Sequence, residues 1–166
     1  TTADGGRTKA GITFQLVDCL KTTYSMNGSN TNVNGWRGST MRTSTMATLL
    51  NQLSSDLKSV LKFVNKVTSV GNNSSGLETT SDKLFLLSEI EVFGATQYSY
   101  AGEGKQYEYY TAGNSTIKKV NGSAYYWWER SPYSGYTNGF CCVGYNGNAN
   151  NCNASCSRGV SFGFCV

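Results

Sequence analysis

The spacing of apolar residues predicts one strand and then two helices in the first part of the chain. Residues 11–20 alternate apolar with polar or small side chains, which is typical of a strand. Residues 39–53 repeat their apolar side chains at helical spacing, and Ser39 is a candidate N-cap. A second helix is predicted over residues 54–64. The single apolar stripe on each helix indicates a face that packs on the core.

The following part of the chain predicts a flexible loop and then a buried strand. Residues 71–76 read GNNSSG, a composition typical of loops. Residues 84–87 read LFLL, and a short continuous apolar run bounded by polar residues favours a buried strand. Residues 98–110 are rich in Tyr, Gly and Glu, and we expect a packed irregular loop there.

The last third of the chain predicts a hairpin and a closing strand. A strand over residues 140–145 meets Asn146-Gly147, the strongest hairpin-turn signal in the chain, and a second strand returns over 148–154. Residues 159–166 are again strand-like. This order predicts an α+β fold with two helices, a mostly antiparallel sheet and long irregular loops. A length of 166 residues suits a single domain.

We expect several aromatic residues and two cysteines to be buried in the core. Trp36 lies in a polar loop and is expected to insert back into the core. Trp127 and Trp128 are adjacent in an extended segment, which would place one of them in the core. Cys141 and Cys165 each follow a phenylalanine in an apolar run, and we interpret them as small buried core residues.

Composition and charge narrow the functional classes. The net charge of +4 is mild and no basic stripe is present, which argues against nucleic-acid binding. The absence of histidine removes the commonest general base and metal ligand. No signal peptide and no apolar run of membrane-spanning length is present, and the opening residues resemble the middle of a longer polypeptide. We therefore expect no metal, no cofactor, no catalytic residues and no membrane contact.

Two acidic residues need a separate interpretation. Glu89 and Glu91 stand two positions apart among apolar neighbours, and paired carboxylates can perform acid–base chemistry or hold Ca²⁺. The interpretation we favour is that they hydrogen-bond to backbone or arginine and face water.

The segment over residues 131–157 has an unusual composition. All but six of its 27 residues are Ser, Tyr, Asn, Gly or Cys, and none is charged. Changing only the adenines of an Asn codon, AAC or AAT, yields Tyr, Ser, Cys and Gly, so the segment has the composition that adenine-directed mutation of an Asn-rich template would leave. Ordinary low-complexity composition is the alternative, but it does not explain the apolar residues that persist at intervals. We interpret these as a fixed skeleton: Trp127, Trp128, Pro132, Phe140, Val143, Ala149 and Ala154.

These residues resemble a known family. The C-terminal half is similar to the variable proteins of diversity-generating retroelements, which have a C-type-lectin-like fold and end in a fixed tail like SRGVSFGF at 157–164. Residues 10–166 also resemble an uncharacterised domain family of gut Firmicutes and their phages. The motifs behind that second resemblance are GWRGSTMR at 35–42, SDKLFLLSEIEVFG at 81–94, EGKQY at 103–107, WWERSP at 127–132 and GFCV at 163–166.

The resemblance implies a non-enzymatic, hypervariable binding domain on a phage tail fibre or a bacterial surface, with a host cell-surface protein or glycan as its target. The whole chain would be one C-type-lectin-like domain, the C-terminal part of a longer protein whose remainder could bring copies together, with a variable region at 125–157. The calcium-binding Glu-Pro-Asn motif of sugar-binding C-type lectins is absent from this chain, so calcium-dependent sugar binding is not expected. The expected ligand-binding residues are Tyr125, Tyr126, Glu129, Tyr133, Ser134, Gly135, Tyr136, Asn138, Cys142, Gly144, Tyr145, Asn146, Asn148, Asn150, Asn151, Cys152, Asn153, Ser155 and Cys156.

Three alternatives stay open. A fixed-specificity glycan or cell-wall binding module would use the same Tyr-rich composition. An enzyme related to formylglycine-generating enzymes would need a reactive thiol of low pKa at Cys141 or Cys165. A structural virion part would use the same surface for assembly. The binding-surface hypothesis makes one prediction about structure, namely that the interchangeable side chains share one exposed face.

Overall fold

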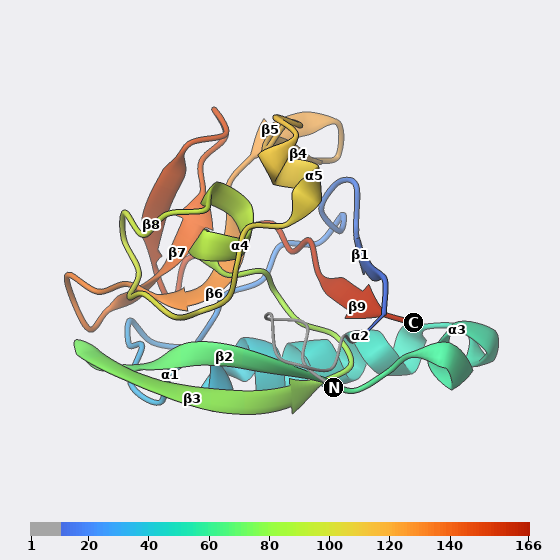
Figure 1. Cartoon of the computed structure of the whole chain (residues 1–166), viewed down its shortest axis with the longest axis horizontal. Coiled ribbons are helices and arrows are strands. Elements are labelled where there is room, and N and C mark those ends of the chain that lie inside the picture. The colour runs from blue at the N-terminus through green and yellow to red at the C-terminus, as the bar shows by residue number, and fades with distance from the viewer. Residues whose placement is uncertain (1–10) are drawn as a thin grey trace.

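The computed structural model describes residues 11–166 and has a mixed α/β architecture of short helices and small antiparallel sheets (Figure 1). The opening residues, which we expected to continue from a longer polypeptide, lie outside the described part. The β2–β3 hairpin runs along one side of the molecule, with α1 against β2, and a second layer holds the β6–β7–β8 sheet and α4 (Figure 1). The α+β prediction is confirmed at this level.

The predicted first strand is shorter than expected and pairs with the end of the chain. β1 (Thr13–Gln15) lies antiparallel to β9 (Gly163–Cys165), with Phe14 opposite Phe164 and their rings stacked 5.5 Å apart. This pairing joins segments from near the two ends of the sequence, so it closes the fold around the elements between them (Figure 1).

The two predicted helices exist, but both are broken or shortened. α1 (Gly35–Gly38) carries Trp36, which is fully buried as predicted. The expected first helix begins with a π-helical turn, η1 (Met41–Thr45), and continues as α2 (Met46–Gln52). α3 (Ser55–Val60) follows, and Ser54 caps it by accepting a hydrogen bond from the backbone N–H of Leu57.

The region predicted as the end of a helix and a flexible loop is a long hairpin, so that prediction was wrong. β2 (Val64–Gly71) pairs antiparallel with β3 (Ser74–Asp82) through a two-residue turn. Asn72 and Asn73 both have φ of 56°, the left-handed conformation that such turns require. Gly71 also has positive φ, and a Cβ there would lie 1.9 Å from the carbonyl oxygen of Asn32, so only glycine fits.

Residues 84–87 are buried as predicted, but they do not form a strand ladder. Only Phe85 makes a bridge, with Gly163, and the run leads into α4 (Glu89–Phe93). Ser88 and Glu91 form a reciprocal capping box at the start of α4, and Gly94 ends it with φ of 72°. The expected loop at 98–110 is irregular except for α5 (Glu108–Thr111).

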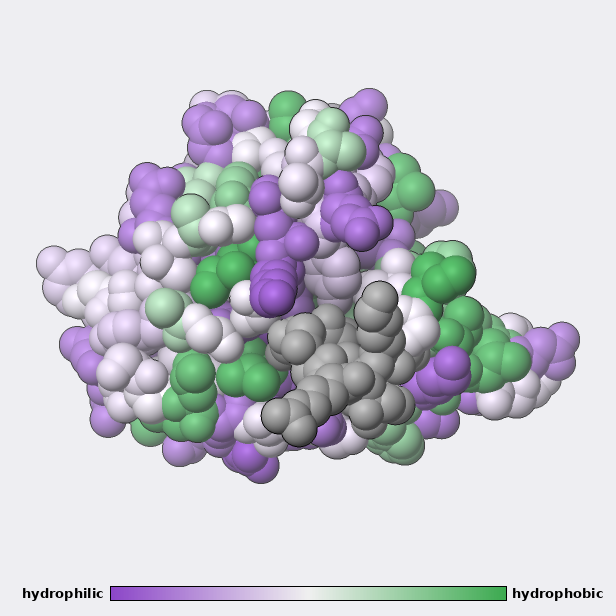
Figure 2. Space-filling view, viewed as in Figure 1, coloured by the Kyte–Doolittle hydropathy of each residue, from purple (hydrophilic) through white to green (hydrophobic). Residues whose placement is uncertain are grey.

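The hairpin predicted in the last third is confirmed, whereas the predicted strand over 159–166 is limited to β9 and the β4–β5 hairpin was not predicted. β4 (Lys118–Val120) and β5 (Ser123–Tyr125) form a small hairpin, and β6 (Trp127–Pro132), β7 (Gly139–Val143) and β8 (Ala149–Asn153) form a three-stranded antiparallel sheet. The turn between β7 and β8 contains the predicted Asn146-Gly147, and Gly147 has φ of 85°. Figure 2 shows a largely hydrophilic face, with apolar side chains gathered over the region of α3 and β9 and away from β8.

Candidate functional site

The predicted skeleton forms the core of the β6–β7–β8 sheet. Six of its seven members are buried and Ala149 is half-buried. We expected only one of the adjacent tryptophans in the core, but both are fully buried because β6 is covered on both faces. The indole N–H of Trp127 donates to the carbonyl oxygen of Thr116 at 3.0 Å, and that of Trp128 donates to Tyr24 at 2.8 Å.

We call the 19 expected ligand-binding residues the interchangeable residues, because the sequence predicts that they vary. Most of them reach solvent. Eight are exposed: Gly135, Tyr136, Asn138, Tyr145, Asn146, Asn148, Asn153 and Ser155. Seven are half-buried: Tyr125, Tyr126, Tyr133, Ser134, Asn150, Asn151 and Cys156. The remaining four are buried: Glu129, Cys142, Gly144 and Cys152.

The prediction of an exposed binding position is wrong for those four buried residues. β7 is the central strand of the sheet, and every residue in it is buried. Cys142 therefore faces packed neighbours, whichever way it points. Glu129 lies within β6, which is equally buried along its length. Codon composition cannot distinguish buried from exposed positions, because burial depends on which strand lies in the middle of the sheet.

Tyrosines that are exposed or half-buried form two patches at opposite ends of the sheet. At one end, the ring of Tyr133 packs edge-on against that of Tyr98, with the ring centroids 5.9 Å apart, and its centroid lies 5.8 Å from that of Tyr136. We call these three residues the Tyr133 patch. At the other end, Tyr126 contacts Tyr145 at 5.6 Å; we call this pair the Tyr145 patch. Pro132 pairs with Phe140 at the first end and Trp127 with Val143 at the second, so the length of the sheet separates the patches.

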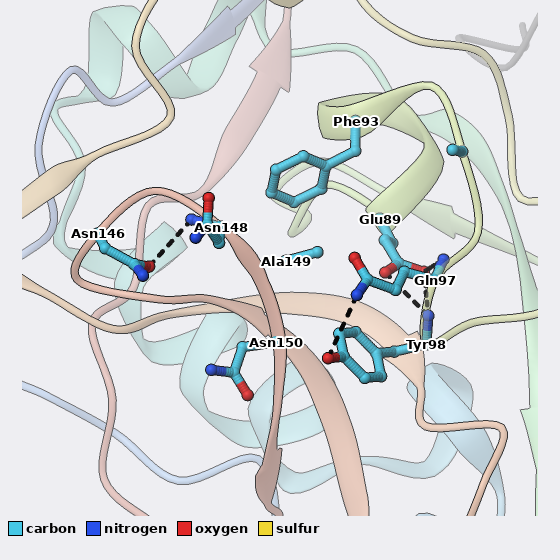
Figure 3. A pocket seen from close by; sticks show the side chains of 9 residues that line it. Glu89, Phe93, Gln97, Tyr98, Asn146, Asn148, Ala149 and Asn150 are labelled. Atoms are coloured by element: carbon cyan, nitrogen blue, oxygen red, sulfur yellow. Dashed lines mark hydrogen bonds between the residues drawn. The ribbon is translucent and has the colours of Figure 1, made fainter.

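A pocket of about 480 Å³ opens beside the turn between β7 and β8 (Figure 3). One wall consists of the interchangeable Asn146, Asn148 and Asn150 with the skeleton residue Ala149. The other wall comes from α4 and the segment after it, outside the variable region: Glu89, Phe93, Ala95, Gln97 and Tyr98. Phe93 and Tyr98 present aromatic rings on the α4 side, next to the carboxamide of Gln97, whereas the side chain of Asn150 points away from them (Figure 3). Rings beside a carboxamide suit a ligand with both apolar faces and hydroxyl groups.

Glu89 holds the fixed wall of this pocket in place. Its carboxylate is buried and accepts hydrogen bonds from the backbone N–H groups of Gln97, Tyr98 and Ser99, as well as from the Ser99 hydroxyl at 2.6 Å. We predicted hydrogen bonding to backbone, which is confirmed, and exposure to water, which is wrong. Glu89 thus fixes the loop that carries Tyr98 into the Tyr133 patch.

Glu91 lies in a buried charged cluster behind β6 that the sequence did not reveal. Its carboxylate pairs with the guanidinium of Arg130 and the ammonium of Lys66, and all three side chains are almost completely buried. Arg130 also donates to the carbonyl oxygens of Leu86 at 3.1 Å and Val67 at 3.0 Å. Burial opposes ionisation, but the two cations outweigh it and lower the pKa of Glu91 to about 2. The predicted pairing with arginine is confirmed, and the predicted contact with water is wrong.

Two further buried acids flank this cluster. Glu103 accepts from the backbone N–H of Ser69 at 2.8 Å and also contacts the hydroxyl of Ser131, and burial raises its pKa to about 7. Neither carboxyl oxygen of Glu129 has a hydrogen-bond partner among residues 11–166. Burial, with the nearby charges of Glu89 and Glu103, raises the pKa of Glu129 well above its ordinary value. Burial therefore favours the neutral form of Glu129.

The cysteines and acids offer no metal centre in the part of the chain that the structure describes. No group of three or more cysteine, aspartate or glutamate side chains within residues 11–166 is arranged to hold a metal ion. Cys141 and Cys165 are buried, as predicted, and burial raises the pKa of both thiols. Neither thiol has the low pKa that the enzyme alternative requires. None of the described helices is both long and apolar enough to cross a bilayer.

Comparison with known proteins gives one match. No curated protein and no solved structure matches the chain. Residues 11–166 match the family model described as Domain of unknown function (DUF6273), and the chain belongs to this family.

Proposed function

We propose that this chain is a hypervariable ligand-binding domain of C-type-lectin-like fold, the variable protein of a diversity-generating retroelement. It would bind a host cell-surface protein or glycan, without enzymatic activity, from a phage tail fibre or a bacterial surface. The observation that carries the proposal is the division within residues 125–157. Six of the seven skeleton residues are buried, whereas 15 of the 19 interchangeable residues are exposed or half-buried.

The chemistry of the exposed positions supports binding. Tyr136 and Tyr145 expose 66% and 56% of their surface, and tyrosine provides a large, stiff contact area. The asparagines around them supply adaptable hydrogen bonds, and no charge in residues 131–157 adds a desolvation cost. The buried sheet beneath them allows side chains to change while the backbone keeps its geometry.

A binding assay with matched tyrosine substitutions tests this proposal. The labelled chain is applied to a panel of intact bacterial cells and to a glycan array. Tyr136→Ser and Tyr145→Ser should each weaken binding at least tenfold, since aromatic anchors dominate such interfaces. Tyr109→Ser is the control, because Tyr109 is 58% exposed but lies on α5, outside the variable region. Equal binding by all three variants would contradict the proposal.

A fixed-specificity glycan or cell-wall binding module is the second candidate, and the pocket favours it. Phe93 and Tyr98 offer rings on which a sugar could stack, and both lie outside the variable region. If Phe93→Ala and Tyr98→Ala abolish glycan binding while Asn146→Ser and Asn148→Ser leave it unchanged, the fixed wall is the binding site. Loss of binding in the asparagine variants supports the variable surface instead.

A structural virion part is distinguished by a different readout. If the exposed tyrosines pack against another subunit, substituting Tyr133, Tyr136 and Tyr145 should impair particle assembly. The binding proposal expects intact particles that adsorb poorly to host cells.

A further inference from the structure

Two thiols are neighbours on one face of the β7–β8 hairpin. Phe140 pairs with Cys152 and Cys142 pairs with Asn150, so Cys142 and Cys152 are diagonal neighbours on the same face of the sheet. The two thiols interact electrostatically, since each shifts the pKa of the other. Both thiols are free, and the binding surface proposed above uses neither of them.

A cation from outside the hairpin completes the arrangement. Arg158 donates from Nε to the sulfur of Cys152 at 3.3 Å. Proximity to the Cys142 thiol lowers the pKa of Cys152, burial opposes this, and the hydrogen bond from Arg158 reinforces the lowering, which leaves the pKa at about 7. The pKa of Cys142 is raised instead, first by its proximity to Cys152 and then by burial. Arg158 lies against the sulfur of Cys152, so Cys152 is the thiol whose thiolate has a cation beside it.

Cys152 is also the more exposed of the two cysteines. Cys152 lies on β8, the edge strand of the sheet, and is 7% exposed. Cys142 lies on the central strand β7 and is fully buried. A small reagent reaches Cys152 first, and Cys142 stands behind it.

We propose that Cys142 and Cys152 form a redox-active thiol pair that reacts with small-molecule disulfides. The Cys152 thiolate attacks one sulfur of the reagent RSSR, forms a mixed disulfide and releases the first thiolate RS⁻. Cys142 then loses its proton and attacks the Cys152 sulfur, which forms the Cys142–Cys152 disulfide and releases the second RS⁻. The cysteines lose two electrons and two protons, and one RSSR becomes two RSH.

The fold accommodates this product with a limited movement. A diagonal pair is farther apart than a directly opposite pair, so closing the bond draws β8 towards β7. β8 is an edge strand, paired on one side only within the sheet. The resulting bond links the two strands on either side of the turn that carries Asn146 and Asn148, which would hold one wall of the pocket in place.

Arg158 connects the thiol pair to the Tyr145 patch. Its guanidinium lies 5.1 Å from the ring centroid of Tyr126, which in turn contacts Tyr145. Oxidation removes the thiolate that Arg158 binds, so the environment of these two rings should change with the redox state of the pair.

The test uses the purified, reduced chain and hydroxyethyl disulfide as the reagent. Intact mass should show the loss of two hydrogens, and a peptide map should link Cys142 to Cys152. Cys142→Ser should stop at a stable mixed disulfide on Cys152, because no resolving thiol remains. Cys152→Ser should react at least tenfold more slowly, and Cys156→Ser, the matched control on a half-buried neighbour, should close the bond at the parent rate.

Three outcomes would overturn the proposal. They are a first adduct on Cys19 or Cys156, a bond between Cys152 and Cys156, and a Cys152→Ser variant that reacts as fast as the parent. A second measurement on the unsubstituted chain covers the case in which a variant fails to fold. The rate of the first step should rise with pH around 7 and level off above it, and a rise centred near 9, the ordinary cysteine value, would also contradict the proposal.

Discussion

Glu91 and its two cationic partners illustrate how single residues determine the stability of this domain. The carboxylate is buried between Arg130 and Lys66, and each of the three side chains has an exposed fraction of at most 1%. A buried charge is tolerated only when opposite charges and hydrogen bonds replace water around it. Arg130 meets that condition with further bonds to Thr68 and to backbone carbonyl oxygens.

Breaking this cluster should be costly. Glu91→Gln leaves two buried cations without their shared anion, so we expect the free energy of unfolding to fall by about 3–5 kcal/mol. Arg37→Ala is the control, because Arg37 pairs with Glu78 at the surface with half of its side chain exposed. Its removal should cost under about 1 kcal/mol. Urea unfolding measures both, and similar losses in the two variants would refute a special role for the cluster.

The shifted acids predict how stability depends on pH. Glu91 has a folded pKa of about 2, below its unfolded value of 4.5, so its contribution is full above pH 4.5 and is lost as pH falls towards 2. Glu103 has a folded pKa of about 7, above its unfolded value of 4.5, so it stabilises the fold below pH 4.5 and loses this contribution as pH rises to 7. Glu129 acts in the same direction as Glu103.

Stability should therefore be greatest near pH 5. The difference in the pKa of Glu103 corresponds to a loss on the order of 3 kcal/mol between about pH 5 and pH 7. Glu103→Gln should flatten that decline, because its amide does not ionise. Unfolding free energies measured across this range check the prediction, and an unchanged slope in Glu103→Gln would show that another group titrates.

The sequence could not reveal these residue-scale features. Glu91 and Arg130 are 39 positions apart, and Lys66 lies 25 positions before Glu91, so no local pattern connects them. A charged residue between apolar neighbours normally indicates an exposed position. That general rule led to the expectation that Glu89 and Glu91 face water.

At the scale of elements, the β6–β7–β8 sheet buries the proposed skeleton and leaves most of the proposed interchangeable positions accessible. Its strands and its turn follow from local signals, namely apolar runs and Asn146-Gly147, and the sequence predicted them. The β2–β3 hairpin escaped prediction because two of its inward-facing residues are Lys66 and Thr68, which bind Glu91 and Arg130 rather than forming an apolar stripe. The strand was therefore not predicted, because its buried polar residues interrupt the apolar pattern from which a strand is recognised.

The division within the sheet predicts a contrast in stability. Phe140 is fully buried on β7, and Phe140→Ala should cost about 3–5 kcal/mol through lost burial and a cavity. Asn148 is exposed in the adjacent turn, and Asn148→Ser should change the unfolding free energy by less than about 0.5 kcal/mol. Thermal and urea denaturation of both variants provide the measurement. A large loss in Asn148→Ser would mean that this position is not free to vary.

At the scale of the whole molecule, the residues that we propose to be interchangeable lie on a scaffold whose other elements we propose stay fixed. The length of the sheet separates the Tyr133 patch from the Tyr145 patch. The pocket lies where fixed and interchangeable walls meet. The sequence predicted the composition of this surface and most of its members. It could not predict the split into two patches or the burial of Cys142, Cys152 and Glu129, because both follow from strand order and register.

Sequencing the coding segment for residues 125–157 across a source population, together with its genomic neighbourhood, tests the central claim most directly. The proposal predicts substitutions concentrated at adenine positions of interchangeable codons such as those for Tyr136, Tyr145 and Asn148, with Phe140 and Val143 unchanged. It also predicts a near-repeat of the segment, differing only at adenines, beside a reverse transcriptase gene. An invariant segment with no such repeat would contradict the account and favour a binding site of fixed specificity.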